Sequence, residues 1–400
     1  MNNLGFIEKL LDEEQVEWVR LGDVDFFEIA NSGRKPVKAS LRVAGDTPYY
    51  GANNIQDYVE GFTHEGEYAL IAEDGSASLE SYSIQYATGR FWANNHVHVV
   101  RGLDKVNTRY LFHYLCIVNF IPYLTGGGRA KLTRGKLVEI PVPIPCPDNP
   151  KKSLEIQAEI VRILDAFTAM TAELTAELNL RQQQYNYYRD QLLSFDEGEV
   201  EWKTLPEMAL DFGRGKSKHR PRNDARLYGG HIPFIQTGDI RSASHIITRF
   251  NQTYSELGLR QSKLWPKGTL CITIAANIAE TSILGFDACF PDSVIGFVAD
   301  PKKTSSGYVE YLLQSIKRKL EEKGREKSSA QSNINLATFE QLKLPFPSLV
   351  EQARIVAILD KFDTLTSSLS EGLPREIELR QKQYEYYRDL LFSFPKPEAG

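Results

Sequence analysis

The sequence predicts an α+β protein in which two globular mixed α/β domains alternate with two long helices. The prediction rests on two observations: the helical part occurs twice, and each copy follows short β-rich runs separated by Gly, Asp and Asn. A chain of 400 residues is long enough for several cores of this kind. The predicted boundaries are 1–152 for the first domain, 153–195 for the first helix, 196–347 for the second domain, 348–395 for the second helix and 396–400 for a tail.

The repeat is clearest where each predicted helix ends. LRQQQYNYYRDQLLSF (180–195) and LRQKQYEYYRDLLFSF (379–394) differ at four of sixteen positions. Upstream, QAEIVRILD (157–165) corresponds to QARIVAILD (352–360). The offset between the copies grows from 195 to 199 residues, so the second copy carries a four-residue insertion.

The helices themselves show a heptad pattern. In the first copy, steps of four and three join Ile160, Leu164, Phe167, Thr171, Leu174, Leu178, Arg181, Tyr185, Tyr188 and Leu192. In the second copy the insertion falls near Gly372 and Pro374, so we expect a kink or a short break near 372–374. We predict that the two helices pack as an antiparallel coiled coil with an approximate two-fold axis, although the seam alone also allows parallel packing.

The globular parts read as short strands with one helix each. The predicted strands are EYALIA (67–72), HVHVV (96–100), TLCITIA (269–275) and SVIGFVA (293–299). The predicted helices lie near Thr108 to Leu115 and Gly307 to Leu320. At the ends of the domains, VEW (16–18) corresponds to VEW (200–202), and IPVP (140–143) to LPFP (344–347). The proline-rich exits should end a strand and start the long helix.

Composition excludes several classes of protein. With 47 Lys and Arg against 52 Asp and Glu, the net charge is −5, so any contact with nucleic acid must come from local basic surfaces. The four cysteines are widely spaced and form no CxxC pair, which argues against a zinc site or a disulfide framework. The N-terminus lacks the pattern of a secretion signal, so we expect a cytoplasmic protein.

Enzyme motifs are also missing from the sequence. Neither Gly215-Lys216-Ser217 nor the stretch from Gly128 to Gly135 completes a P-loop, and there is no GxGxxG and no methyltransferase NPPY or DPPY tetrapeptide. His96 and His98 could share a strand face, but no third ligand lies nearby in the sequence. We therefore expect no catalytic residue, no metal site and no cofactor in this chain.

Basic residues gather in one loop of each globular part, and these loops are the candidates for binding DNA. RGKSKHRPRNDAR (214–226) has six Lys or Arg and one Asp, and GGGRAKLTRGK (126–136) places four cations behind three glycines. Planar amides nearby are candidates for reading base edges, although each could equally be a turn residue. The candidate DNA-binding residues are Asn53, Asn54, Asn94, Asn95, Arg129, Lys131 and Arg134 in the first domain, and Arg214, Lys216, Lys218, Arg220, Arg222, Gln236, Asp239, Asn277, Gln331 and Asn333 in the second.

Together these features resemble the specificity subunits of type I restriction–modification systems. The resemblance rests on the proline-rich exits that lead into QAEIVRILDAF and QARIVAILDKF, and on the two tyrosine-rich tails. YALIAEDGS (68–76), FWANNHVHVV (91–100) and TLCITIAANIAET (269–281) also look like recognition-domain segments of that family. The first exit is longer than the second and therefore places the first helix further from its strand.

The resemblance implies that each globular part is a target-recognition domain that reads one half of a bipartite, asymmetric DNA site. It also implies that the helices set the spacing and dock two methyltransferase subunits, with restriction and translocase subunits in the full complex. S-adenosylmethionine, ATP and Mg would then be bound by those partners. Tyr187 and Tyr386 are the candidate docking residues, since the neighbouring tyrosines belong to the seam. The alternatives are a fused enzyme and a duplicated coiled-coil scaffold without DNA binding.

Overall fold

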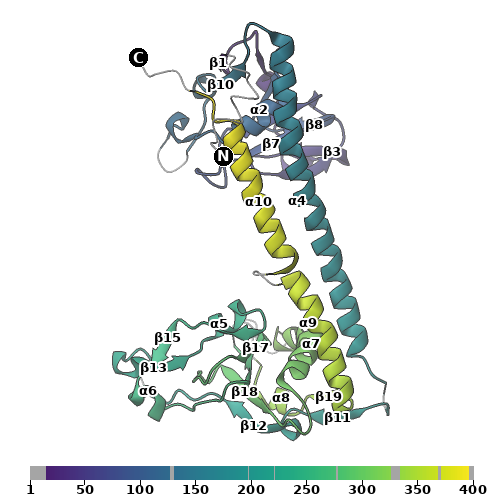
Figure 1. Ribbon diagram of the computed structural model, residues 1–400, viewed down its shortest axis with the longest axis vertical. Helices are drawn as coiled ribbons and strands as arrows, with labels where there is room; N and C mark the ends of the chain where they lie inside the picture. Colours follow the sequence, from purple (N-terminus) through teal and green to yellow (C-terminus); the bar gives the residue numbers. More distant parts are fainter. Residues whose placement is uncertain are drawn as a thin grey trace. The chain divides into compact units, whose positions relative to one another are not determined.

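The structure is a computed structural model that describes residues 15–126, 130–196, 198–219, 221–275, 278–325, 334–367 and 371–395. It divides into two compact units (Figure 1). Unit 1 comprises Met1–Glu173 and Glu378–Gly400, and unit 2 comprises Leu174–Ile377. Each unit therefore combines one globular domain with parts of both helical segments, and each is described on its own.

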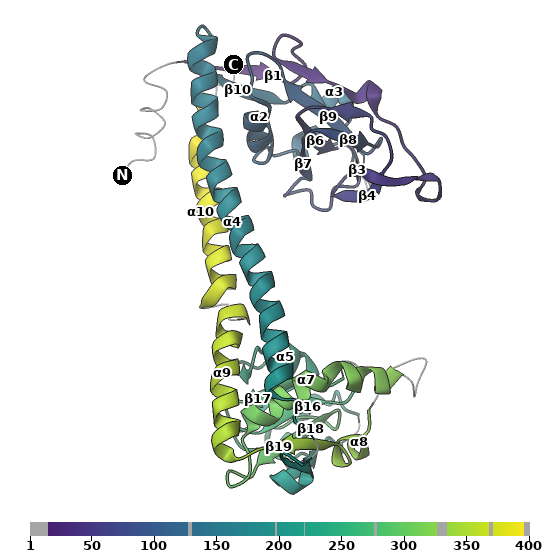
Figure 2. The same ribbon diagram turned by 90° about the vertical axis from the view of Figure 1, so that its right-hand side faces the viewer.

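Unit 1 is built on two four-stranded sheets. Its strands are β1 (Val16–Arg20), β2 (Phe27–Ile29), β3 (Ala44–Tyr50), β4 (Ile55–Val59), β5 (His64–Glu65), β6 (Tyr68–Ala72), β7 (Ile84–Ala87), β8 (Arg90–Ala93), β9 (Val97–Gly102) and β10 (Pro141–Pro145). The sheets have the orders β2-β9-β6-β7 and β4-β3-β8-β5, and β1 pairs with β10 apart from them. Figure 2 shows β3, β4 and β8 grouped beside β6, β7 and β9. Strand β6 is buried along its whole length and lies at the centre of the unit.

The helices of unit 1 cover the first of these sheets. They are α2 (Thr108–Leu115), α3 (Arg134–Leu137) and the first part of α4 (Pro150–Leu192). Short 3-10 turns lie at η1 (Asn31–Gly33), η2 (Ala39–Leu41) and η3 (Ile121–Tyr123). Helix α2 packs on β6, β7 and β9, and Asn107 caps its start by accepting hydrogen bonds from the next turn. Its predicted range was Thr108 to Leu115, which the structure confirms.

Unit 2 repeats this design with one longer sheet. Its strands are β11 (Glu201–Thr204), β12 (Ala209–Arg214), β13 (Tyr228–Phe234), β14 (Ile246–Ile247), β15 (Gln252–Tyr254), β16 (Leu270–Thr273), β17 (Thr281–Leu284), β18 (Val294–Ala299) and β19 (Lys343–Phe346). Its helices and 3-10 turns are η4 (Pro206–Met208), η5 (Ala225–Leu227), α5 (Thr237–Ser242), α6 (Glu256–Arg260), α7 (Ser306–Arg325), α8 (Leu336–Glu340) and α9 (Leu349–Ser367). The main sheet has the order β12-β18-β16-β17-β14, and α7 packs between it and α9 (Figure 1).

The two main sheets share one topology. The order β2-β9-β6-β7 in unit 1 corresponds to β12-β18-β16-β17 in unit 2, and all these pairings are antiparallel. The register also agrees, because Ala72 pairs with Val97 in one unit and Thr273 with Val294 in the other. The four predicted strand runs all lie in these sheets.

The proline-rich exits correspond in a different register from the one the sequence suggested. Trp18 in β1 faces Pro143, and Trp202 in β11 faces Pro345, so VPIP (142–145) is the counterpart of LPFP (344–347). The sequence comparison had aligned IPVP (140–143) with LPFP, two residues away. The β1 and β11 strands fix the register, which the alternating prolines leave open.

The long helices pack antiparallel within each unit, as predicted. In unit 1, Ile160 and Leu164 share a core with Leu391, while Phe167, further along α4, stacks on Tyr387 at 5.2 Å. In unit 2, Tyr185 and Tyr188 contact Phe362, and Leu192 packs with Ile355 and Leu359. In both units the partner residue moves backward along its helix as α4 advances, which defines the antiparallel direction.

The second helical segment is divided, whereas α4 is continuous. Helix α9 ends at Ser367, and α10 (Gly372–Leu391) begins at Gly372, whose φ of 79° is in the left-handed region. A Cβ at Gly372 would lie 2.4 Å from the carbonyl oxygen of Thr364, so no other residue fits there. Pro374 lies in the first turn of α10, where a missing N–H costs little. The expected interruption near 372–374 is therefore a break between two helices.

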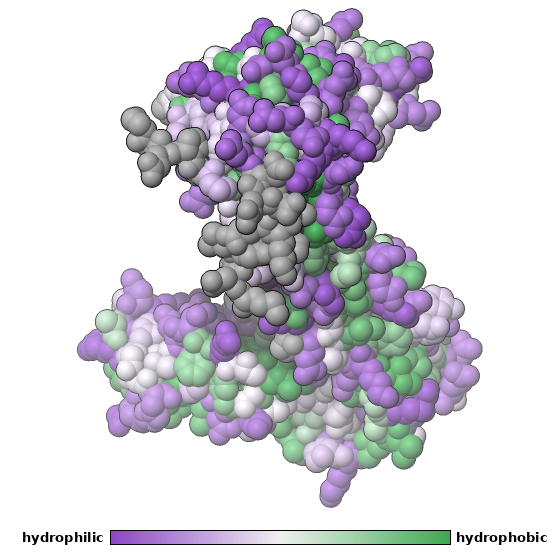
Figure 3. All heavy atoms as spheres, turned by 45° about the horizontal axis from the view of Figure 1, so that its top comes forward, coloured by the Kyte–Doolittle hydropathy of each residue, from purple (hydrophilic) through white to green (hydrophobic). Residues whose placement is uncertain are grey.

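The surface is mixed in polarity. Figure 3 shows hydrophobic residues scattered among hydrophilic ones on the face turned to the reader. Within the described residues, no helix is both long and apolar enough to span a membrane.

Candidate nucleic-acid interface

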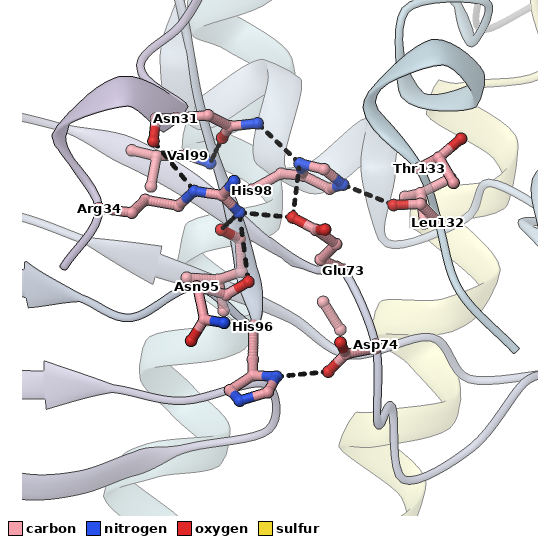
Figure 4. A network of polar contacts seen from close by, with 12 residues as sticks. Asn31, Arg34, Glu73, Asp74, Asn95, His96, His98, Val99, Leu132 and Thr133 are labelled. Atoms are coloured by element: carbon pink, nitrogen blue, oxygen red, sulfur yellow. Dashed lines mark hydrogen bonds and ion pairs between the residues drawn. The ribbon is translucent and has the colours of Figure 1, made fainter. Parts of the chain in front are cut away.

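Unit 1 brings four loops together next to the end of β6 (Figure 4). Glu73, the first residue after β6, lies at their meeting point. Arg34 Nη1 lies 2.5 Å from one of its carboxylate oxygens, and Lys131 Nζ lies 2.9 Å from the other. Arg34 Nη1 also donates to the carbonyl of Val97, at 2.8 Å. One carboxylate thus joins the loop after η1 to the segment before α3.

A buried histidine completes this network. His98 lies in β9, and its Nε2 is 2.7 Å from the carbonyl oxygen of Leu132, which can only accept a hydrogen bond. Nε2 therefore carries the proton, and Nδ1 accepts from Asn31 Nδ2 at 2.8 Å. Asn31 Oδ1 accepts from the backbone N–H of Val99, so both ends of this amide are used. His98, which the sequence places near His96 on one strand, therefore has a structural role in the domain.

The electrostatics of the network follow from burial and pairing. Burial alone would raise the pKa of Glu73, but the hydrogen bonds from Arg34 and Lys131 outweigh it and hold that pKa below its usual value. Burial lowers the pKa of His98, more than its contacts with Leu132 and Glu73 raise it. Glu73 is therefore ionised and His98 neutral at pH 7, and the two cations share one anion.

The side chain of Asn53 stabilises the loop between β6 and β7. Its Nδ2 donates to the carbonyl of Gly75 at 2.9 Å, and its Oδ1 accepts from Ala77 N–H at 2.8 Å and from the Ser83 hydroxyl at 2.6 Å. These bonds shape the loop between β6 and β7. Both ends of the Asn53 amide are therefore hydrogen-bonded within the domain, which agrees with its alternative interpretation as a turn residue.

The other candidates of unit 1 divide into buried and exposed residues. Asn94 is 4% exposed and accepts from the N–H of His96, so it forms a turn. Asn54, Asn95 and Arg134 have exposed side chains. Among the predicted residues of unit 1 that the structure describes, these three can reach a ligand, whereas the half-exposed Lys131 is paired with Glu73.

In unit 2 the basic loop is fixed through its backbone. The carbonyl of Lys216 accepts from Ser262 at 2.8 Å, the N–H of His219 donates to Gln261 at 3.0 Å, and the carbonyl of Arg222 accepts from the Tyr228 hydroxyl at 2.7 Å. Anchoring the main chain in this way leaves the cationic side chains directed outward. Such an arrangement suits phosphate contacts, which position a protein on DNA.

The cations of this loop differ in their pairing. Arg214, Lys216 and Lys218 are exposed, and no ion pair of theirs lies within the described residues. Arg222 forms a bidentate contact with Asp292, at 2.9 and 3.0 Å. Three of the described cations therefore remain available, whereas Arg222 holds the loop to the turn before β18 and Arg226 pairs with Asp224 at 2.7 Å.

Gln236 and Asp239 act together at the start of α5. Asp239 is 6% exposed, accepts from the N–H of Gln236 at 2.8 Å and accepts from Asn251 at 2.7 Å. Gln236 completes this capping box and donates to Gln252. Asp239 is thus buried in a helix cap. The remaining predicted residues, Arg129, Arg220, Asn277, Gln331 and Asn333, lie outside the described residues.

Sequence reasoning missed a mainly apolar groove of unit 1 that has two cations, Lys35 and Arg42, in its lining. A groove of about 540 Å³ lies between the η1–η2 segment and β3, β4 and β8, lined by Lys35, Arg42, Tyr49 and Trp92 among others. The Arg42 guanidinium lies 4.1 Å from the centre of the Tyr49 ring. The stretch GRKPVKASLR (33–42), with four cations around a Pro, was the signal that could have found it.

Metal chemistry has no visible place in the described parts of the chain. Among those residues, no group of three or more His, Cys, Asp or Glu is close enough to hold a metal ion. His96 Nδ1 lies 2.5 Å from Asp74, so that histidine is also held by its own domain.

The helices expose the same apolar side chains in both units. Tyr187 is 62% exposed and its counterpart Tyr386 is 53% exposed. Leu180 and Leu379 are likewise 48% and 39% exposed. Tyr187 and Tyr386 lie off the packed seam, as predicted, while Tyr185 and Tyr384 face the cores. Exposed residues that stay identical in two otherwise divergent copies are typical of a surface used twice.

Comparison with known proteins gives a consistent answer. Residues 13–181 and 200–379 match the family described as type I restriction modification DNA specificity domain. A putative type I restriction enzyme specificity subunit of Haemophilus influenzae is 46% identical over an alignment of 410 positions. The alignment covers 98% of this chain and 99% of that protein. The EcoR124I/EcoR124II specificity subunit of Escherichia coli is 36% identical over 100% of this chain and 99% of its own length.

A solved structure shares the fold at low sequence identity. The type I restriction–modification S subunit from M. genitalium matches with a TM-score of 0.56 and 13% identity, over 96% of this chain and 98% of that one. The duplicated domains, the antiparallel helices within each unit and the full-length relatives all agree. The chain belongs to the family of type I restriction–modification specificity subunits.

Proposed function

We propose that this chain is the DNA sequence-specificity subunit of a type I restriction–modification complex. Each globular domain reads one half of a bipartite, asymmetric DNA site. The observation that carries this function is a duplicated junction: two domains with different surface loops are joined to their helices by the same contacts. Its support also includes the family match over both halves of the chain.

A buried tyrosine forms the first of these contacts. In unit 1, the hydroxyl of Tyr110 in α2 donates to the carbonyl of Pro143 at 2.8 Å. In unit 2, the hydroxyl of Tyr308 in α7 donates to the carbonyl of Pro345 at 3.1 Å. Pro143 and Pro345 occupy the same register position opposite the paired tryptophans. The exit strand is thus fixed to the domain helix in the same way twice.

A buried glutamine forms the second contact. Gln157 in α4 donates to the carbonyl of Lys105 at 3.1 Å, and Gln352 in α9 donates to the carbonyl of Lys303 at 3.0 Å. Both glutamines are at most 3% exposed. Because the amide binds backbone, the contact does not depend on the loop sequence, and each domain keeps a fixed attachment to its helix.

The loops that differ are where base reading belongs. Unit 1 offers Asn54, Asn95 and Arg134, and unit 2 offers Arg214, Lys216 and Lys218. Since the first set holds two amides and one arginine, whereas the second holds only cations at a different spacing, the two half-sites should differ in sequence. The exposed lysines and arginines supply phosphate contacts that hold the register.

The helices are the part that recruits partners. We assign the docking of two methyltransferase subunits to the exposed Tyr187 and Tyr386 with Leu180 and Leu379, since one partner surface would fit both copies. Restriction and translocase subunits would join the full complex. S-adenosylmethionine, ATP and Mg belong to those partners in this proposal.

The test is to express the chain with its methyltransferase partner and to sequence the modified bases of the host DNA. The expected result is one bipartite site with two unlike halves and a fixed gap. A chain with Lys216→Glu and Lys218→Glu should bind all sequences more weakly and show a salt slope that is flatter by about one per lost phosphate contact. Lys302→Glu, at another exposed lysine of unit 2, is the matched control. Modification without a bipartite site, or an unchanged slope, would contradict the respective part of the proposal.

A further inference from the structure

The position of Glu73 is equivalent to a definite position in unit 2. The N–H of Glu73 donates to the carbonyl of His96 at 2.8 Å, and its carbonyl accepts from Leu132 at 2.8 Å. In unit 2, the N–H of Ile274 donates to the carbonyl of Ser293 at 3.0 Å, and its carbonyl accepts from Ile334 at 3.1 Å. Main-chain bonding is therefore the same at the point where the loop after the central strand leaves the sheet.

The side chains at this position have opposite character. Ile274 and Ile334 join one hydrophobic core with Ile295, which takes the place of His98 in the register. In unit 1 the same place holds Glu73 with Arg34 and the neutral His98 (Figure 4). Lys131 is the second cation paired with Glu73. The loops of unit 2 are thus anchored by apolar packing, whereas those of unit 1 are anchored by one carboxylate shared between two cations.

We propose that Glu73 is a positioning residue for DNA reading by unit 1: it pairs with Arg34 and Lys131 and so sets the geometry of the loops that bear the exposed Asn95 and Arg134. The inference rests on the proposed function, because it assumes that these loops face DNA. Unit 2 needs no such residue, and its half-site should not depend on Glu73.

The charge of Glu73 has a consequence beyond loop shape. Its side chain is 14% exposed and neutralises Arg34, 17% exposed, and Lys131, 46% exposed. Replacing Glu73 by Gln keeps the side-chain size but removes the negative charge that neutralises Arg34 and Lys131, so the loop becomes more positive and Lys131 becomes available to phosphate. Arg34 retains its bonds to the carbonyls of Asn31 and Val97, so the domain should still fold. The variant should therefore bind DNA more tightly without sequence preference, and discriminate less.

The experiment compares the full-length chain with Glu73→Gln on a pool of random-sequence duplexes, followed by sequencing of the bound fraction. The unmodified chain should select two separate blocks of base pairs. In Glu73→Gln, one block should lose roughly tenfold in discrimination while the other stays intact. Affinity for a duplex that lacks both blocks should rise, with a salt slope steeper by about one to two.

Glu28→Gln is the matched control, because Glu28 also pairs with an arginine of unit 1, Arg101, but outside the network. It should leave both blocks intact. Two intact blocks in Glu73→Gln would overturn the inference and leave the proposed function standing. Loss of sequence selection together with loss of non-specific binding would assign Glu73 to fold stability and also overturn it. A wild-type chain that selects no sequence would instead reject the proposed function.

Discussion

The two units agree where they meet the helices and differ where their loops leave the sheet. Tyr110 and Tyr308 bond the same proline position, yet Glu73 and Ile274 occupy one backbone site with opposite polarity. The difference teaches that attachment to a common helix pair constrains a few buried side chains. The site where the loop after the central strand begins is free to change, even to exchange an ion network for an apolar core.

The largest expected effect concerns the region where both units meet the long helices through the same contacts. Ile160 in unit 1 and Ile355 in unit 2 are repeat counterparts, and both are fully buried. Each change to Ala should reduce the free energy of unfolding by about 2–5 kcal/mol, because it deletes buried methyl groups and leaves a cavity. Urea unfolding of Ile160→Ala and Ile355→Ala would measure this, and a cost in one unit several times that in the other would break the equivalence.

A second pair of substitutions examines the polar part of the junction. Gln157→Ala leaves the part-buried carbonyl of Lys105 without this donor, and Gln352→Ala does the same to the carbonyls of Lys303 and Pro347. We expect each to cost about 1–3 kcal/mol. Thermal unfolding monitored by circular dichroism would measure it, with exposed Gln183→Ala as the control. An unchanged melting temperature in either variant would show that water can replace the glutamine amide at that site.

The units should respond oppositely to pH. The pKa of Glu73 is lowered, so its contacts stabilise unit 1 above the usual glutamate pKa and are lost as the pH falls through the folded value. His245 lies 2.5 Å from buried Glu310, whose hydrogen bond raises the pKa of the histidine. Its contribution to unit 2 is present below the usual histidine pKa and is lost as the pH rises through the folded value.

Hydrogen exchange followed by mass spectrometry would localise these two responses. Protection factors, which are corrected for the intrinsic pH dependence of amide exchange, should fall in unit 1 at acid pH and in unit 2 above neutral pH. Glu73→Gln should flatten the first response and His245→Gln the second. If both variants altered the pH response of the same unit, the assignment of one titrating network to each unit would be wrong.

The smallest effect on stability is expected at the exposed tyrosines. Tyr187→Ala and Tyr386→Ala should each change the free energy of unfolding by less than about 0.5 kcal/mol, because these side chains are mostly solvated. Binding to the methyltransferase partner should nevertheless weaken in each, and more in the double variant. Calorimetric titration with that partner would show it, and unchanged affinity in the double variant would remove both residues from the docking surface.

Much of the fold could be read from the sequence, because the repeat and the heptad pattern are local signals. The range of α2 and the four strand runs needed only periodicity and turn residues. The register of the exits could not be read, since IPVPIP places a proline at every second position and a shift by two leaves the pattern unchanged. The pairing with Trp18 decides it.

The candidate site was harder to predict. Asn53, Asn94 and Asp239 have the residue types that read bases, but the same groups satisfy backbone in loops and caps, and only tertiary contacts distinguish the two uses. Arg34 and Glu73 are 39 residues apart and meet only when the sheet forms. The exposed cations of 214–218 were found because charge clusters are visible without a fold.

Asn31 opposes protonation of His98 in unit 1. Its oxygen already accepts from Val99 N–H, so the amide cannot turn its oxygen toward His98 without losing that bond. A second proton on the imidazole would therefore confront an NH2 group, donor against donor. Protonating this ring would cost the domain one interior hydrogen bond, either that of Asn31 with His98 or that of Asn31 with Val99, which favours a single tautomer of His98 at the base of the loops.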